Sequence, residues 1–315
     1  MKVLYIAPTF IGGIGGHAKR VSEKLNKHGF DIELFNVPHI PIKNLKNPSF
    51  AFFGTINALI QRKKYDVVHA WNIPSGFVMK RISAKKKILS VHGVYGEQLE
   101  IMHSKFTSKL GIFAESEAFK IADVLTTDSK FVQKTYKKKF GIDFVYLPAP
   151  LDLEKFKKIE NNLQTKNQIV YVGRDSYEKG IDILKNIESK ISANVVYCTN
   201  TPWEQTMKIL KESKILIVPS RMESIPQVIK EAFFLKIPVI ATNVGGIPEI
   251  IENGKTGILI PPENQEKTLS SINNLLKNKI LSKRLSENAY NFINENFSWK
   301  TLLPNYINLY KNSFN

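Results

Sequence analysis

Short apolar runs of strand length alternate with helical patterns through the first half of the chain. An apolar run bounded by turn residues is typical of a strand buried in a parallel sheet, whereas apolar residues three and four positions apart indicate a helix. We expect strands at residues 3–7, 31–37, 66–70, 87–92, 123–127 and 144–147, and helices at 18–28, 50–60 and 113–122. This alternation predicts a doubly wound α/β domain.

A polar stretch rich in Lys, Asn, Glu and Gln interrupts the pattern between residues 148 and 168, and we place a domain boundary there. Ser298 is placed to N-cap a last helix that runs through Tyr310. Between them we expect strands at 169–173, 195–198, 215–218 and 238–241, and helices at 181–190, at 204–211 and from Pro226 onward. The second half is therefore predicted to be another α/β domain.

Two glutamates lie in the stretch from Ile215 to Gly257, which reads as strand, loop, helix, strand, glycine turn and a second short helix that starts at Pro248. Glu223 precedes the helix and Glu231 lies inside it. The carboxyl ends of parallel strands face the crevice where open α/β sheets bind ligands. Such a pair of carboxylates can accept hydrogen bonds from sugar hydroxyls, although a surface position on the helix is the simpler interpretation of Glu231.

A glycine-rich segment, Gly12-Gly13-Ile14-Gly15-Gly16-His17, follows the first strand. Backbone N–H groups between a strand and a helix N-terminus can hold a phosphate. The glycine spacing differs from the dinucleotide fingerprint G-x-G-x-x-G. A turn that serves only packing explains the segment about equally well.

The net charge is +17, and it is concentrated in the first half of the chain. Residues 1–150 carry 23 Lys and Arg against 11 Asp and Glu, a balance of +12. Such a surface can attract anionic lipid, nucleic acid or a polyanionic substrate, or it can be an ordinary solvated face. Nucleic acid is the least favoured partner, because the lysines are scattered and no aromatic platform accompanies them.

Cysteine content and hydropathy favour a cytoplasmic protein. Cys198 is the single cysteine, so the chain has no internal disulfide and too little sulfur for a zinc knuckle. Its apolar neighbours indicate a buried thiol in a strand, and the compartment is expected to be reducing. Met1 to Phe10 reads as a first strand and not as a secretory leader. No apolar stretch approaches the roughly 20 residues that span a bilayer.

Several motifs in this order resemble those of one enzyme family, the retaining nucleotide-sugar glycosyltransferases of family four. The motifs are Gly12-Gly13-x-x-x-His17, Asp66-Val67-Val68-His69, Val91-His92-Gly93, Asp152-Leu153-Glu154-Lys155-Phe156, Val172-Gly173-Arg174 with Lys179-Gly180, Glu223-x₇-Glu231, Pro238-Val239-Ile240-Ala241, Gly245-Gly246-Ile247-Pro248-Glu249 and Phe297-Ser298-Trp299. The resemblance spans nearly the whole chain.

The resemblance implies the GT-B fold, in which two Rossmann-like doubly wound domains face a cleft. Residues 1–150 would form the acceptor-side domain and residues 151–296 the nucleotide-sugar domain. Residues 297–315 would form a last helix that crosses back to the first domain. The implied reaction is metal-independent transfer of a sugar, with retention, from a donor such as a UDP- or GDP-sugar. The acceptor would be a glycan, a lipid-linked molecule or another cell-envelope acceptor, and no further cofactor is implied.

The resemblance also assigns roles in the site. Arg174 and Lys179 would neutralise the departing diphosphate, since Arg offers a fork of donors and Lys a point charge. Glu223 would meet the sugar hydroxyls and Glu231 the ribose hydroxyls. His92 would lie against the transferred sugar. The segment Gly13, Gly15, Gly16 and His17 would contact the donor phosphates, and the amides of Ser224 and Ile225 the sugar or phosphate.

Three departures from the family pattern qualify these roles. Ser224-Ile225-Pro226 replaces the usual glycines after Glu223 and removes one amide donor. Pro148-Ala149-Pro150 stands where Pro-Asn-Gly is common, and only one helix fits between Val195 and Ile215, so the second domain is expected to lack one strand–helix unit. None of these changes removes the paired glutamates, Arg174 or Lys179.

Two other functions compete with sugar transfer. Nucleotide-sugar 2-epimerases have the same fold, and a basic protein that binds membrane or nucleic acid would also use the charged first half. The apolar helix at residues 50–60, followed by Arg62-Lys63-Lys64, either packs on the first sheet or lies on an anionic membrane surface, which would place the protein at the cytoplasmic face.

Overall fold

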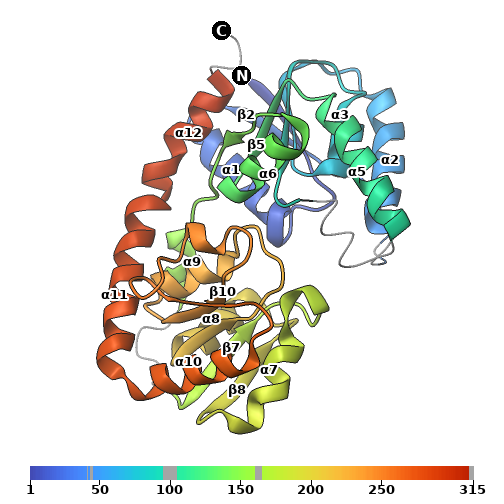
Figure 1. Ribbon diagram of the computed structural model, residues 1–315. Helices are drawn as coiled ribbons and strands as arrows, with labels where there is room; N and C mark the ends of the chain where they lie inside the picture. Colours follow the sequence, from blue (N-terminus) through green and yellow to red (C-terminus); the bar gives the residue numbers. More distant parts are fainter. Residues whose placement is uncertain (41, 43–44, 95–104, 160–164, 312–315) are drawn as a thin grey trace. The chain divides into compact units, whose positions relative to one another are not determined.

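The computed structural model describes residues 1–40, 42, 45–94, 105–159 and 165–311 (Figure 1). The chain forms two compact units, Met1–Ala149 together with the chain from Leu303 onward, and Pro150–Leu302. Each unit is built on one parallel sheet with flanking helices, which confirms the α/β class. The chain passes from the first unit to the second after Ala149, and it returns to the first unit after Leu302, inside the last helix.

The sheet of the first unit has the strand order β2-β1-β3-β4-β5-β6. In β1, Leu4 and Ile6 join a core cluster with Phe50 and Val78, while the ring of Tyr5 stacks 6.4 Å from that of Tyr310 on the other side. Because successive side chains of a strand point to opposite faces, β1 is buried on both. The elements are β1 Lys2–Ile6, α1 Gly13–Asn26, β2 Asp31–Phe35, α2 Lys46–Ile60, β3 Tyr65–Ala70, α3 Ile73–Met79, β4 Ala84–Val91, α5 Lys105–Phe119, β5 Val124–Thr127, α6 Lys130–Phe140 and β6 Val145–Tyr146.

Two helices of this unit were not predicted from the apolar pattern. α3 has seven residues and includes Pro74 and Gly76, so it is too short and too interrupted to show a helical period. Its start is set by Asn72, whose side chain accepts the N–H of Ser75 at 2.9 Å. α6 is rich in lysine, and Val132 and Tyr136 are its buried residues.

The sheet of the second unit has the strand order β11-β10-β9-β7-β8. One helix, α8, joins β8 to β9, as expected from the short sequence between them. The predicted second short helix at Pro248 is a single 3₁₀ turn, Ile247–Glu249. The elements are β7 Gln168–Val172, α7 Ile181–Ile187, β8 Asn194–Cys198, α8 Trp203–Glu212, β9 Ile215–Val218, α9 Gln227–Phe234, β10 Val239–Thr242, β11 Ile258–Ile260, α10 Gln265–Lys277, α11 Lys279–Asn296 and α12 Trp299–Lys311.

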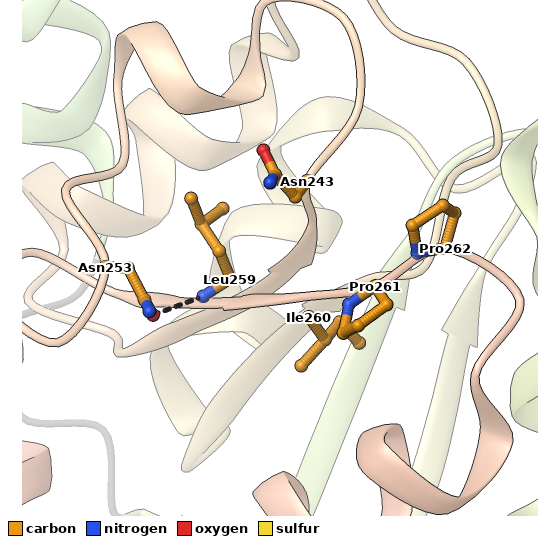
Figure 2. Close-up of a pocket in the computed structure, with 6 residues that line it drawn as sticks. All are labelled: Asn243, Asn253, Leu259, Ile260, Pro261 and Pro262. Carbon is orange, nitrogen blue, oxygen red and sulfur yellow. Dashed lines mark hydrogen bonds between the residues drawn. The ribbon is translucent and has the colours of Figure 1, made fainter.

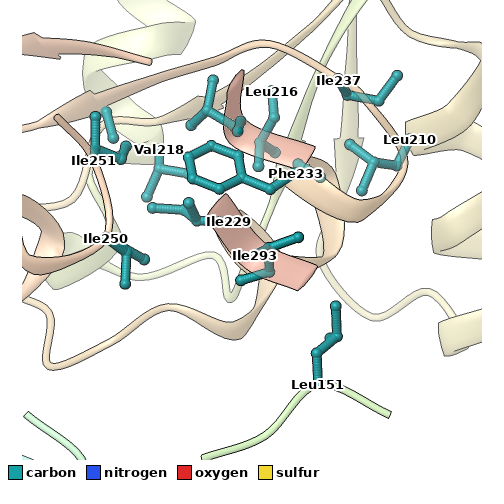
Figure 3. Packing of buried hydrophobic residues seen from close by; sticks show 14 of the residues in the cluster. Leu151, Leu210, Leu216, Val218, Ile229, Phe233, Ile237, Ile250, Ile251 and Ile293 are labelled. Carbon is teal, nitrogen blue, oxygen red and sulfur yellow. The ribbon is translucent and has the colours of Figure 1, made fainter. Parts of the chain in front are cut away.

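The central strand β9 is buried on both faces, which explains its uninterrupted apolar sequence. Leu216 and Val218 belong to a cluster with Phe233 of α9 and other residues of α9 and α11 (Figure 3). Ile215 and Ile217 point the other way, into a second cluster with residues of α7 and α10. Burying a side chain such as Phe233 stabilises the fold by about 1.5–3 kcal/mol. The loops at the carboxyl end of β9 therefore start from a rigid strand.

The last helix, α12, begins in the second unit and ends in the first. The Oγ of Ser298 accepts the N–H of Thr301 at 3.1 Å, which confirms the predicted N-cap. Beyond Leu303, Tyr306 and Tyr310 are buried in the first unit. The predicted return of the last helix to the first unit is confirmed.

Helix α2 is buried on one side and exposes apolar residues on the other. Phe50, Gly54 and Ala58 are buried, and α2 packs on α3. Phe52 and Leu59 are 63% and 64% exposed. The predicted packing on the first unit is thus confirmed for one side of the helix. Among the described residues, no helix combines the length and apolar character that crossing a membrane requires.

Candidate functional site

The closest polar contact in the candidate site of the second unit joins Lys179 and Glu223. Lys179 closes a turn that follows β7, and Glu223 lies in the loop after β9; the two strands are parallel neighbours, so their carboxyl ends share one edge of the sheet. Lys179 Nζ donates to Glu223 Oε1 at 2.6 Å, and Ser220 Oγ donates to the same oxygen at 3.1 Å. The Lys179 and Glu223 side chains are 22% and 11% exposed, so the pair is largely withdrawn from water.

The backbone of Glu223 is held by the glycine turn after β10. A Cβ atom on Gly245 would lie 1.8 Å from the carbonyl oxygen of Glu223, and Gly245 has φ +53°. The N–H of Gly246 approaches the same carbonyl at 3.4 Å. Only glycine tolerates both the conformation and the close approach. The predicted glycine turn therefore supports the loop that carries Glu223.

Arg174 lies on the surface beside Lys179. Its Nη2 is 2.9 Å from Glu178 Oε1, and the Arg174 side chain is 63% exposed while that of Glu178 is 10% exposed. An ion pair with one exposed partner contributes little to stability, so the guanidinium can turn toward an anionic ligand at small cost. Both predicted cations thus occupy the same turn region after β7, each beside a carboxylate.

The sequence analysis missed Arg221, which ties the Glu223 loop to the start of α7. Its guanidinium makes two hydrogen bonds of 2.7 Å to the Asp182 carboxylate and lies 3.8 Å from the centroid of the Tyr177 ring. The Asp182 hydrogen bond raises the pKa of Arg221 and also holds that of the Asp182 carboxyl below its ordinary value. No motif marks this residue, because its partners are distant in the sequence.

Glu231 is held by a tryptophan that the sequence analysis also missed. Trp203, the first residue of α8, donates its Nε1–H to Glu231 Oε1 at 2.8 Å. The Trp203 ring packs edge-on against Phe156 at 5.3 Å and lies 5.6 Å from Lys155 Nζ. Glu231 is therefore an oriented carboxylate in α9 and not a freely solvated surface residue.

Ser224 and Ile225 lie in the loop that leads into α9. Ile225 is buried, and its side chain belongs to the same apolar cluster as Val218 and Phe233. Pro226 precedes α9 as its N-cap residue, with φ −68° and ψ 118°, so the helix starts one residue later than predicted. The backbone amides of Ser224 and Ile225 thus lie just before the helix N-terminus, a position suited to an anionic group.

In the first unit, the glycine-rich segment is helical and not a loop. Helix α1 starts at Gly13, so Gly13, Gly15, Gly16 and His17 all lie in its first turns, several residues before the predicted start. A Cβ on Gly15 would lie 1.7 Å from the carbonyl oxygen of Thr9. Close packing thus requires this glycine. Gly13 and Gly15 also line a pocket of about 380 Å³ with Asn72, so the segment borders space that a ligand can enter.

His17 is buried and hydrogen-bonded. Its Nε2 lies 3.0 Å from the hydroxyl of Tyr306, and that hydroxyl donates to the carbonyl of Pro148 at 3.2 Å. Because a tyrosine hydroxyl has one hydrogen, its oxygen accepts the second bond, so His17 carries its proton on Nε2.

His92 follows β4 directly and pairs with Asp128, the residue that follows β5. His92 Nδ1 lies 3.1 Å from Asp128 Oδ2. The ring of Trp71 lies nearly parallel to that of His92, with centroids 6.2 Å apart. The ring of His17 is 6.4 Å away and roughly perpendicular. His92 is therefore packed between aromatic rings at the carboxyl edge of the first sheet.

Beneath this pair, a fully buried chain of hydrogen bonds runs across the first sheet. His69 Nδ1 contacts the Tyr310 hydroxyl at 2.6 Å, and His69 Nε2 contacts Ser90 Oγ at 2.7 Å. Ser90 Oγ in turn lies 2.6 Å from Thr126 Oγ1, and Tyr310 contacts the Tyr5 hydroxyl at 2.7 Å. Burial lowers the pKa of His69 well below its ordinary value. His69 thus stays neutral and structural.

A pocket of the second unit, of about 360 Å³, lies away from the predicted residues. Figure 2 shows it beside β11, lined by Asn243, Leu259 and Pro261 among others. The side chain of Asn253 accepts the N–H of Leu259 at 2.9 Å there. None of the predicted site residues lines this pocket.

Two family models match the chain. The model described as Glycosyltransferase Family 4 matches residues 11–155, and the model described as Glycosyl transferases group 1 matches residues 184–292. Together they account for most of both units. The chain is a family 4 glycosyltransferase.

Relatives of this glycosyltransferase are similar along most of its length. An uncharacterized glycosyltransferase of Methanocaldococcus jannaschii, MJ1069, is 26% identical over 329 residues, covering 89% of this chain and 82% of the relative. TuaC of Bacillus subtilis, a glycosyltransferase proposed for teichuronic acid biosynthesis, is 26% identical over 278 residues, covering 78% of this chain and 70% of TuaC.

Solved structures identify the fold of the glycosyltransferase. Sucrose-phosphate synthase of Thermosynechococcus elongatus aligns with a TM-score of 0.82 at 15% identity, covering 100% of this chain and 99% of that one. Anabaena HepE, solved in complex with UDP and glucose, aligns with a TM-score of 0.74 at 14% identity, covering 99% and 100%. The predicted GT-B fold is confirmed.

Proposed function

We propose that this glycosyltransferase transfers a sugar from a nucleotide-sugar donor, with retention and without a metal ion, to a glycan, a lipid-linked molecule or another cell-envelope acceptor. The observation that carries the proposal is the contact of 2.6 Å between Lys179 and Glu223 at the carboxyl edge of the second sheet. It brings together, largely out of water, a cation suited to a phosphate and a carboxylate suited to sugar hydroxyls.

The second unit would bind the donor through charges of both signs. Negative charge accumulates on the diphosphate as the glycosidic bond breaks, and Arg174 and Lys179 would stabilise it. The carboxylate of Glu231, already oriented by the indole of Trp203, would accept hydrogen bonds from the ribose hydroxyls. Glu223 would accept hydrogen bonds from the hydroxyls of the sugar. The backbone amides of Ser224 and Ile225 would contact the sugar or the phosphate.

The first unit would contribute His92 and the start of α1. The positive end of the α1 dipole favours an anionic group beside the pocket that Gly13 and Gly15 line. His92 would hydrogen-bond the transferred sugar. A HepE structure with bound UDP and glucose supports a nucleotide-sugar donor for this chain. The role in teichuronic acid biosynthesis proposed for TuaC supports an envelope acceptor.

A donor panel tests the proposal. We expect one UDP- or GDP-sugar to raise the melting temperature, and release of its nucleoside diphosphate to accelerate on adding a glycan or lipid-linked acceptor mixture, with EDTA present. The product linkage, read by NMR, should keep the anomeric configuration of the donor. Conversion of the donor to its C2 epimer without acceptor would favour the epimerase instead. Binding of no nucleotide sugar would contradict the proposal.

We further propose that the exposed side of α2 contacts the anionic cytoplasmic membrane surface. Phe52 and Leu59, together with Phe53, Ile56 and Ile60, leave a run of apolar side chains exposed on one helix of a strongly basic unit. Apolar insertion combined with attraction of basic residues to anionic headgroups is how interfacial helices bind.

Vesicle sedimentation checks this contact. The protein should bind vesicles that contain phosphatidylglycerol and not vesicles of phosphatidylcholine alone. The double substitution Phe52→Ser and Leu59→Ser should reduce the bound fraction at least about fivefold. Ile280→Ser in α11 removes an even more exposed apolar residue, 86% exposed, from the other unit and should not change binding. Equal binding by all three proteins would exclude α2 as the contact.

A further inference from the structure

His92 and Asp128 are brought together by the register of two neighbouring strands. β4 and β5 are parallel, and Val91 pairs with Thr127 as the last aligned residues. His92 and Asp128 are the next residue on each strand, so both side chains leave the sheet at its carboxyl edge. The imidazole and carboxylate are 10% and 9% exposed, and Nδ1 and Oδ2 lie 3.1 Å apart.

The other ring nitrogen of His92 is buried and unsatisfied. Within the part of the chain that the structure describes, Nε2 has no hydrogen-bond partner. Leaving a buried polar atom unpaired costs about 1–3 kcal/mol, so such an atom calls for an explanation. In this position a ligand group would supply the missing bond.

The carboxylate determines which nitrogen carries the proton. An ionised Asp128 can only accept hydrogen bonds, so Nδ1 of His92 must donate to it. The neutral imidazole then has its lone pair on Nε2 and can accept one hydrogen bond there. The contact of Nδ1 with Asp128 orients the imidazole between the parallel ring of Trp71 and the roughly perpendicular ring of His17, so the direction of that lone pair is defined as well.

We propose that Asp128 is a positioning residue that holds His92 in the Nδ1–H form, so that Nε2 accepts a hydrogen bond from a hydroxyl of the sugar substrate. This inference rests on the proposed function for the identity of the ligand. It involves no transfer of a proton, because Asp128 acts only through the orientation and tautomer of His92. A substrate hydroxyl completes the set of hydrogen bonds that the fold leaves open.

Asp128→Asn tests the role of the carboxylate with little change in shape. An amide can accept from Nδ1 or donate to it, so the variant no longer selects one tautomer. We expect kcat/KM to fall about 10- to 100-fold, in line with the loss of a hydrogen bond to a charged group. In a His92→Ala background, Asp128→Asn should cause no further loss, because Asp128 would have nothing to orient.

Asp123→Asn is the matched control. Asp123 is the residue just before β5, at the end of the strand opposite to Asp128. Its carboxylate accepts the backbone N–H of Lys87 at 2.7 Å, so its role is structural. Asp123→Asn should leave kcat/KM unchanged even where it lowers the melting temperature. Equal losses from Asp123→Asn and Asp128→Asn would indicate a structural role for both and overturn the proposal.

Nitrogen NMR of the full chain with ¹⁵N-labelled histidine reads the tautomer directly. The resonances of His92, assigned by comparison with His92→Ala, should show a protonated Nδ1 and an unprotonated Nε2, and Asp128→Asn should populate the other form. A wild-type His92 protonated on Nε2 alone would overturn the proposal. This measurement needs no donor, so failure of the proposed function and failure of this inference give different results.

Discussion

Replacing Lys179 with alanine is expected to lower the rate of sugar transfer about 100- to 1,000-fold while the protein remains folded. The variant removes a cation from the point where the departing diphosphate gains charge, and a single such group supplies an effect of that size. It also leaves the Glu223 carboxylate, which now shares a contact of 2.6 Å with Lys179, facing the donor phosphates without its counter-ion. The donor KM should rise for that reason.

The measurement is steady-state kinetics with the donor identified by the panel, with thermal unfolding followed in parallel. Lys185→Ala is the matched control, because Lys185 in α7 makes a similar ion pair with Asp175 at 3.0 Å but is 49% exposed and has no predicted role. Adding Glu223→Gln to Lys179→Ala should lower the donor KM again, since the repulsion is removed. Full activity of Lys179→Ala would mean that the donor site is assigned wrongly.

Gly245→Ala is expected to destabilise the second unit by at least about 2 kcal/mol and to abolish most activity. A left-handed conformation costs a residue with a Cβ about 1–2 kcal/mol. The new Cβ would also lie 1.8 Å from the carbonyl oxygen of Glu223, so the loop has to move. A loss of 2 kcal/mol corresponds to roughly 4–8 °C in melting temperature for a protein region of this size. Displacement of Glu223 removes its contact with Lys179.

Gly254→Ala separates the two causes of this loss. Gly254 also has a positive φ, +74°, but nothing lies within 4 Å of the position its Cβ would take. We expect it to lose about 1 kcal/mol and to keep its activity. The free energy of unfolding, measured by calorimetry, and the rate of sugar transfer are compared between the two variants. If Gly245→Ala unfolded and reacted like Gly254→Ala, the close approach to Glu223 would have no importance for the site.

The buried strands were predictable because they are short, apolar and bounded by turn residues. β9, for example, is predicted and observed at Ile215–Val218, since burial on both faces requires an uninterrupted apolar run. Helices whose apolar face is narrow were not predictable. α6 is strongly basic and has two buried side chains, Val132 and Tyr136, which is too weak a signal in eleven residues.

The start of α1 shows how packing overrides local preference. Glycines disfavour a helix, so the sequence indicates a loop through Gly16. In the structure, Gly15 allows the first turn of α1 to lie against the backbone of Thr9, closer than any side chain would permit. Contacts with distant backbone compensate for the poor helix propensity of these residues.

By itself, the sequence determined the alternation of strands and helices and the organisation into two units. It also determined the order of motifs that identifies the enzyme family. These depend on local apolar periodicity and on residue types at fixed spacing. Only the tertiary structure decided which side chains from distant parts of the sequence come into contact. Asp128 beside His92, Trp203 beside Glu231 and Arg221 beside Asp182 lie 36, 28 and 39 residues apart, and each contact depends on strand register and helix packing. Such registers are set by the burial of whole faces and not by any short stretch, so no local pattern reveals them.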